Sequence, residues 1–73
     1  MRMKIEFDQE ADALYIQFQT GKVAKTIKVQ QGIAVDIAKD GRIFGIEILD
    51  ASQRIPLSQI SRVNLNFPIA KAA

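Results

Sequence analysis

The chain has 73 residues, of which 48% are hydrophobic and 25% charged, and its formal net charge is +2. A chain of this length supports one domain, expected over residues 1–73, and domains this small often need a partner. Cysteine and histidine are absent, which excludes disulfides, thiolate chemistry and the commonest catalytic and metal-binding side chains. Ten basic against eight acidic side chains do not favour a nucleic-acid partner.

Charged residues interrupt the amino-terminal segment from Arg2 to Glu10, so it contains no apolar stretch of signal-peptide length. No later segment approaches the length of a membrane span. We therefore expect a cytoplasmic protein without a membrane partner.

Alternating apolar and polar residues predict two strands at the start of the chain. The strands flank a turn-forming segment at residues 8–13, which contains three acidic side chains. A hairpin across this turn places three apolar pairs on one face: Phe7 with Leu14, Ile5 with Ile16, and Met3 with Phe18.

A second hairpin is predicted where Gln30-Gln31-Gly32 connects two alternating runs. Glycine at the last position of a three-residue connection suits a residue with positive φ. This register pairs Val29 with Ile33 and Ile27 with Val35.

A third hairpin is predicted at Asp40-Gly41, which favours a type I′ turn with positive φ at both residues. A slip of one residue would move Asp36 and Glu47 onto the apolar face, so the register is well specified. The resulting pairs are Ile37 with Phe44, Val35 with Ile46, and Ile33 with Ile48. Together the hairpins predict five strands in meander order.

The carboxy-terminal part combines helix and strand signals. Asp50 is a good helix N-cap and Pro56 prevents a continuous helix through it, so we expect a turn of helix at residues 50–54. We expect a short helix near residues 57–61, and residues 62–67 either form a sixth strand or extend that helix. The predicted fold class is mainly β, or β-rich α+β: an antiparallel meander of five or six strands with a short helix near the carboxy terminus.

An acidic triplet in the first turn has the spacing of half a calcium loop: Asp8, Glu10 and Asp12. An EF-hand requires glycine where this chain has Ala13, and a bidentate glutamate where it has Gln19. The triplet is better explained as local turn capping, and we predict no metal site.

Two carboxylates, Asp36 and Glu47, are predicted to lie on the polar face near two small residues, Ala34 and Gly45. Paired carboxylates need an enclosing pocket to act as acid and base, and the sequence indicates none. The small residues leave space for a ligand or a covering segment. Tyr15, on the same face, is interpreted as a packing residue or an interface anchor. We predict no catalytic residue, no cofactor and no enzymatic activity.

Lys22, Lys25 and Lys28 form the one locally basic stretch. Such a stretch can contact the phosphates of a nucleic acid, but lysines also protect exposed strands from edge-to-edge aggregation. No aromatic residue lies between them to stack on bases, which favours the protective role.

Three segments carry a resemblance to a family: Lys4-Ile-Glu-Phe-Asp8, Glu10-Ala-Asp-Ala-Leu-Tyr-Ile16, and Asp40-Gly-Arg-Ile43 followed by Gly45 to Ser52. Together they resemble the small prokaryotic proteins called domain of unknown function 2283 (DUF2283), over about residues 3–55. Gln9 stands where family members often have proline, which loosens the turn. The resemblance implies a compact β-rich fold and, for some members, one half of a two-gene toxin–antitoxin-like pair, but it implies no catalytic residues.

The aligned apolar face is larger than a two-turn helix can cover. The sequence therefore predicts a protein-interaction domain that forms a homodimer or binds a different small protein. An antitoxin-like partner of an adjacent toxin and a small-ligand-binding half-barrel remain alternatives. The predicted interaction residues are Tyr15, Ile16, Phe18, Val35, Phe44 and Ile46.

Overall fold

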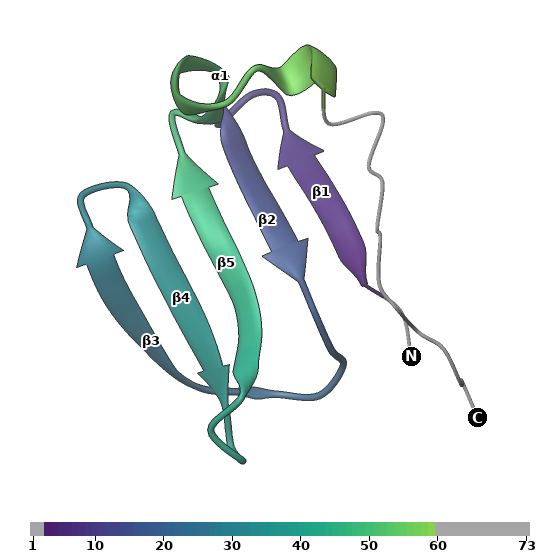
Figure 1. Ribbon diagram of the computed structural model, residues 1–73, viewed down its shortest axis with the longest axis vertical. Coiled ribbons are helices and arrows are strands. Elements are labelled where there is room, and N and C mark those ends of the chain that lie inside the picture. The colour runs from purple at the N-terminus through teal and green to yellow at the C-terminus, as the bar shows by residue number, and fades with distance from the viewer. Residues whose placement is uncertain (1–2, 60–73) are drawn as a thin grey trace, which may run out of the picture.

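The computed structural model describes residues 3–59 and contains one antiparallel sheet with two short helical turns at one end (Figure 1). The fold is mainly β, as predicted from the sequence. The proposed strand or helix at residues 62–67 lies outside the described residues. The elements are β1 (Lys4–Asp8), β2 (Ala13–Gln17), β3 (Val23–Gln30), β4 (Ile33–Ala38), β5 (Ile43–Leu49), α1 (Ala51–Arg54) and the 3₁₀ turn η1 (Leu57–Gln59).

The order of the strands differs from the predicted meander. The sheet runs β1-β2-β5-β4-β3, so β5 lies between β2 and β4, and β3 forms an outer edge. Residues 18–22 carry the chain past the ends of β5 and β4 (Figure 1). The main chain of Phe18 donates a hydrogen bond to the carbonyl of Phe44 at 2.8 Å, which fixes this crossing to β5.

Strand composition explains the arrangement. β5 carries one charged residue and provides two of the buried positions, Phe44 and Gly45, whereas every residue of β3 is exposed and two are lysines. A central strand is flanked by neighbouring strands along both of its edges, while lysines on an outer strand discourage association of edges. A strand with one charged residue therefore lies inside, and a strand with two lysines lies at the edge.

The first hairpin has the predicted register, with Phe7 opposite Leu14 and Ile5 opposite Ile16. Its turn is stabilised by Asp8, whose Oδ1 accepts hydrogen bonds from the main-chain N–H groups of residues 10 and 11 at 3.1 and 3.2 Å. The capping role predicted for Asp8 is confirmed.

The second hairpin follows the prediction in part. Ile27 lies opposite Val35, and Gly32 has a φ of 84°, both as expected. Val29 does not pair with Ile33, because Gln30 takes that position and Val29 is an extra residue in β3. Such a bulge increases the local twist of an edge strand.

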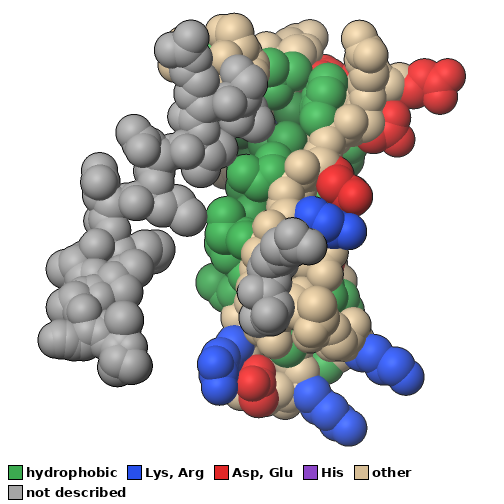
Figure 2. Space-filling view, turned by 90° about the vertical axis from the view of Figure 1, so that its right-hand side faces the viewer, with side chains coloured by type: hydrophobic (Ala, Val, Ile, Leu, Met, Phe, Trp, Pro, Cys, Tyr) green, Lys and Arg blue, Asp and Glu red, His purple; other side chains and the backbone are tan. Residues whose placement is uncertain are grey.

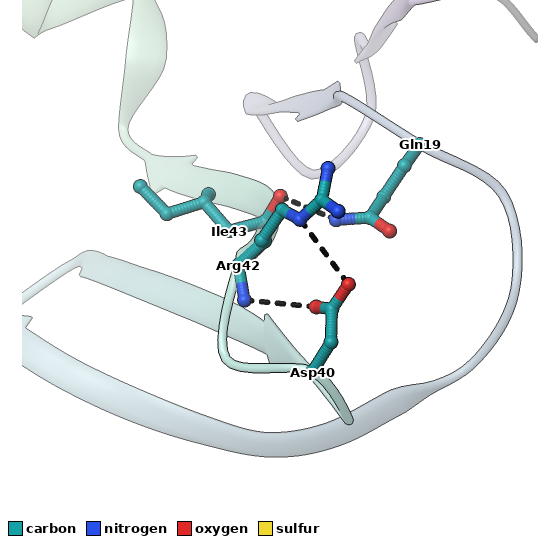
Figure 3. Close-up of polar contacts among 4 residues, drawn as sticks. All are labelled: Gln19, Asp40, Arg42 and Ile43. Atoms are coloured by element: carbon teal, nitrogen blue, oxygen red, sulfur yellow. Dashed lines mark hydrogen bonds and ion pairs between the residues drawn. The ribbon is translucent and has the colours of Figure 1, made fainter.

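The third turn is not type I′, because Gly41 has a φ of 91° but Asp40 does not have positive φ. Ala38 instead forms a closing pair with Arg42, and the N–H of Gly41 donates to the carbonyl of Ala38 at 2.9 Å. The loop is therefore one residue longer than predicted. Figure 3 shows that Asp40 binds Arg42 across this loop, at 3.0 Å to its main-chain N–H and 3.2 Å to Nε.

The longer loop alters the register only near the turn. Ile37 lies opposite Ile43 rather than Phe44, which is an extra residue in β5. The bulge at Phe44 compensates for the longer loop, so that the remaining two pairs agree with the prediction. Those pairs are Val35 with Ile46 and Ile33 with Ile48.

Helix α1 is capped by a residue that the sequence analysis did not assign to it. Asp50 has a φ of 54° and its side chain makes no capping hydrogen bond. Asp12 provides the cap: its Oδ1 accepts from the main-chain N–H of Ser52 at 3.0 Å and its Oδ2 from the Ser52 hydroxyl at 2.8 Å. The turn between β1 and β2 thus caps α1, the helix that follows β5.

Candidate functional site

The two faces of the sheet differ sharply. On the apolar face, one row of aliphatic side chains crosses all five strands, and Figure 2, viewed from the β1 side, shows hydrophobic side chains in a continuous band. Among the described residues of the apolar face, Leu14 and Phe44 are buried, with 1% and 7% of their surface exposed. The row consists of Ile5, Ile16, Ile46, Val35 and Ile27.

The opposite face, here called the polar face, carries a hydrogen-bonded cluster centred on Asp36. The hydroxyl of Tyr15 donates to Asp36 Oδ2 at 2.6 Å, and the hydroxyl of Thr26 donates to Asp36 Oδ1 at 2.6 Å. These side chains come from β2, β4 and β3, although β5 separates β2 from β4. The cluster therefore ties together four adjacent strands.

Tyr15 can reach Asp36 because Gly45, on the intervening strand, has no side chain. An ideal Cβ at residue 45 would overlap the hydroxyl and ring of Tyr15 and would lie 2.8 Å from the carbonyl oxygen of Ile16. The space that the sequence left open for a ligand or covering segment at Gly45 is thus filled by a side chain of the same sheet.

The environment of Tyr15 keeps its phenol protonated. Burial, the hydrogen bond to Asp36, and the negative charges of Asp36 and Glu47 together raise the pKa of Tyr15 to about 12. A group with this pKa does not exchange protons readily near neutral pH. Tyr15 therefore acts as a hydrogen-bond donor that joins strands.

The two predicted carboxylates occupy the predicted positions, Asp36 opposite Gly45 and Glu47 opposite Ala34. Both oxygens of Asp36 are engaged by hydroxyl groups, whereas Glu47 is exposed. An open hollow of about 250 Å³ lies beside Glu47. Its lining residues are Thr26, Lys28, Gly32, Ile33, Ala34, Glu47 and Leu49.

Residues 3–59 contain no group of three or more acidic, histidine or cysteine side chains placed to hold a metal ion. Asp8 and Asp12 of the acidic triplet are engaged in the turn and in the helix cap. Within the same residues, no helix is long and apolar enough to cross a membrane.

The six predicted interaction residues do not form one patch. Ile16, Val35 and Ile46 are neighbours in the aliphatic row, and Phe18 follows β2 with 37% of its surface exposed. Tyr15 lies opposite Glu47 on the polar face. The prediction of an interaction surface stays a prediction. Five of these six residues lie on the apolar face or next to it, and Phe44 among them is buried.

The three lysines of the basic stretch are separated by the sheet. Lys28 lies opposite Ala34 on the polar face, and Lys25 lies opposite Ile37 on the apolar face. Lys22 precedes β3 and shares a hollow with Lys39, a residue that the sequence analysis did not consider. The pairing of β3 with β4, which the sequence predicted from the Gln30-Gln31-Gly32 turn, brings Lys22 and Lys39 together at the open end of that hairpin.

Arg54 is a second residue that sequence reasoning missed. Its Nε donates to the carbonyl of Leu49 at 2.9 Å, and its Nη2 donates to the carbonyl of Gln31 at 3.0 Å. The guanidinium group lies against Gly32, where a Cβ would come within 2.7 Å of it. Arg54 therefore connects α1 to the turn between β3 and β4.

Comparison with known proteins finds a family model that matches residues 4–52, described as protein of unknown function (DUF2283). A Methanosarcina mazei protein named "Putative hypoxanthine phosphoribosyltransferase" is 34% identical over 64 residues, covering 88% of this chain and 51% of that protein. An uncharacterised Methanocaldococcus jannaschii protein is 38% identical over 53 residues, covering 73% of this chain and 45% of that protein. The chain thus spans about half the length of these curated relatives. No solved structure matches it significantly.

Proposed function

The chain belongs to the DUF2283 family of proteins of unknown function, and from its own surface we propose that it is a protein-interaction domain. Its apolar face would be buried against another protein chain. The observation that carries this proposal is the aliphatic row that crosses all five strands. The enzyme name of the Methanosarcina mazei relative describes that protein and is not transferred here.

The described residues form one sheet and two short helical turns. They therefore provide no full second layer over the apolar face. A stable β domain buries a sheet face against a second layer of helices or strands. Five strands of about 17 Å at about 4.8 Å spacing present roughly 400 Å². Helix α1 has four residues, and Ile27 and Phe7 at opposite edges of the face are 45% and 40% exposed.

The β3 edge of the sheet is less suited to association than its apolar face. β3 bulges at Ala24 and at Val29, which leaves a short regular stretch between them, and it carries Lys25 and Lys28. Bulges and lysines are features that prevent strand addition at an edge. These features favour binding through the apolar face over strand addition.

A second copy of the chain is the first candidate for the covering layer, because a two-fold arrangement brings the same apolar rows into contact from both sides. A different small protein is the second candidate. Some members of the family resemble one half of a two-gene pair, which supports that version, in which the face would cover an adjacent gene product.

Light scattering of the full chain tests the self-association version. We expect a dimer at micromolar concentration, converted to monomer by Ile27→Glu or Phe7→Glu, which place a charge on the apolar face. Val23→Glu is the matched control, because Val23 is also on β3 and 42% exposed but lies opposite Ala38, on the polar side. This variant should remain dimeric.

A parent protein that stays monomeric up to hundreds of micromolar overturns self-association. Co-expression with the product of the adjacent gene then decides the other version: co-purification that is lost in Ile27→Glu and kept in Val23→Glu supports it. Failure of both experiments refutes the interaction proposal.

A further inference from the structure

Three lysines gather at the end of the sheet where β3 begins and β4 ends. Val23 pairs with Ala38, which places Lys22 and Lys39 beside each other, and both line a hollow of about 180 Å³. Lys25 lies opposite Ile37, on the apolar face. Figure 2 shows basic side chains gathered at this lower end of the molecule.

A larger hollow of about 430 Å³ lies at the same end. Its floor includes the aliphatic side chains of Ile27 and Ile37, and Lys25 and Lys39 stand among its lining residues. This volume falls within the range of small-molecule sites, which are lined mostly by apolar groups with a few polar ones. The full lining is Ala24, Lys25, Ile27, Ile37, Ala38, Lys39 and Gly41, with no acidic side chain.

The positive charges of this end are not neutralised within the described part of the chain. The structure shows no ion pair there for Lys22, Lys25 or Lys39. The two acidic groups closest in sequence are engaged elsewhere: Asp36 accepts from Tyr15 and Thr26, and Asp40 pairs with Arg42.

We propose that the larger hollow binds a small amphipathic anion, namely a carboxylate with a medium-length hydrocarbon chain. The carboxylate is held between the ammonium groups of Lys25 and Lys39, and the chain lies on Ile27 and Ile37. Lysines recognise such a head group as point charges, and burial of the hydrocarbon provides the remaining affinity. This binding activity goes beyond the protein-interaction role; because Ile27 belongs both to the hollow and to the apolar face, it requires that this end of the face stay open to the ligand.

Isothermal titration of the full chain with octanoate tests the proposal. Octanoate should bind, whereas acetate, which lacks the hydrocarbon, and octan-1-ol, which lacks the charge, should each bind at least about tenfold more weakly. Binding of octanoate should also weaken as salt is raised, because the head group is held by exposed charges.

Single substitutions locate the site. Lys25→Gln and Lys39→Gln should each weaken octanoate binding several-fold, with the urea midpoint and the oligomeric state of the parent retained. Lys28→Gln is the matched control, because Lys28 is also an exposed lysine of β3 but lies on the polar face. Its affinity for octanoate should equal that of the parent.

Each of four results overturns the proposal: no octanoate binding at millimolar concentration, equal binding of octanol, equal binding of acetate, or an equal loss in Lys28→Gln. Binding to phosphatidylglycerol vesicles without binding to free octanoate also refutes it, because that pattern indicates attraction to an anionic membrane surface rather than a small-molecule site.

Discussion

The phenol end of Tyr15 occupies the space that a Cβ on Gly45 would need, and this vacancy lets the phenol on β2 reach the carboxylate of Asp36 on β4. Gly45 does not need positive φ, so its function is to provide space. The hydrogen bond across this face of the sheet therefore depends on a missing side chain in its central strand.

Replacement of Gly45 by alanine should destabilise the fold by about 1–3 kcal/mol, because the new methyl group overlaps Tyr15 and the carbonyl of Ile16. Urea denaturation measures this change. The cost should be smaller in a Tyr15→Ala background, where the ring is gone, and an equal cost in both backgrounds would show that the ring contact is unimportant.

Titration of Tyr15 should be displaced to high pH. It is the single tyrosine of a chain without tryptophan, so absorbance at 295 nm reports it alone. We expect a pKa of about 12 in the folded protein, against about 10 for a free phenol. Asp36→Asn should lower that pKa, because it removes one of the negative charges that oppose ionisation.

The same shift predicts how stability depends on pH. Because the pKa of Tyr15 is higher in the folded state than in the unfolded state, its contribution is complete below pH 10 and is lost as the pH rises through 12. Urea midpoints between pH 9 and pH 12 should fall more steeply for the parent than for Tyr15→Phe. Parallel curves would contradict the assignment.

The helix cap provides a matched pair of substitutions. Asp12 and Asp50 both have left-handed backbone conformations, with φ of 53° and 54°, but only Asp12 accepts hydrogen bonds from Ser52. Asp12→Gly should therefore cost about 1 kcal/mol, and Asp50→Gly should cost little or stabilise slightly. Thermal denaturation followed by circular dichroism separates the two, and equal losses would argue against the cap.

Two arginines provide another comparison. Arg54 donates to two main-chain carbonyls, whereas Arg42 forms an ion pair with Asp40 and has 81% of its side chain exposed. Arg54→Met should cost about 1 kcal/mol, and Arg42→Met roughly 0.5 kcal/mol or less. Both variants lose one positive charge, so a general charge effect would destabilise them equally in the urea experiment.

Local sequence was sufficient for the strands and for most registers within hairpins. Alternation placed Ile5 opposite Ile16 and Val35 opposite Ile46, because a shift of one residue would expose the apolar side chains and bury charges. The turns were harder to predict. A loop one residue longer than expected at Asp40-Gly41 was offset by the bulge at Phe44, and such compensation leaves no trace in the periodicity.

The sequence by itself determined that this protein is mainly β, which residues share a face, and that it lacks cysteine and histidine chemistry. Only the tertiary structure decided that β5 lies between β2 and β4. The contacts of Tyr15 with Asp36 and of Asp12 with Ser52 follow from it. The physical reason is that periodicity specifies which side of a strand is buried, whereas the choice of neighbouring strand depends on how the whole sheet removes apolar surface from water.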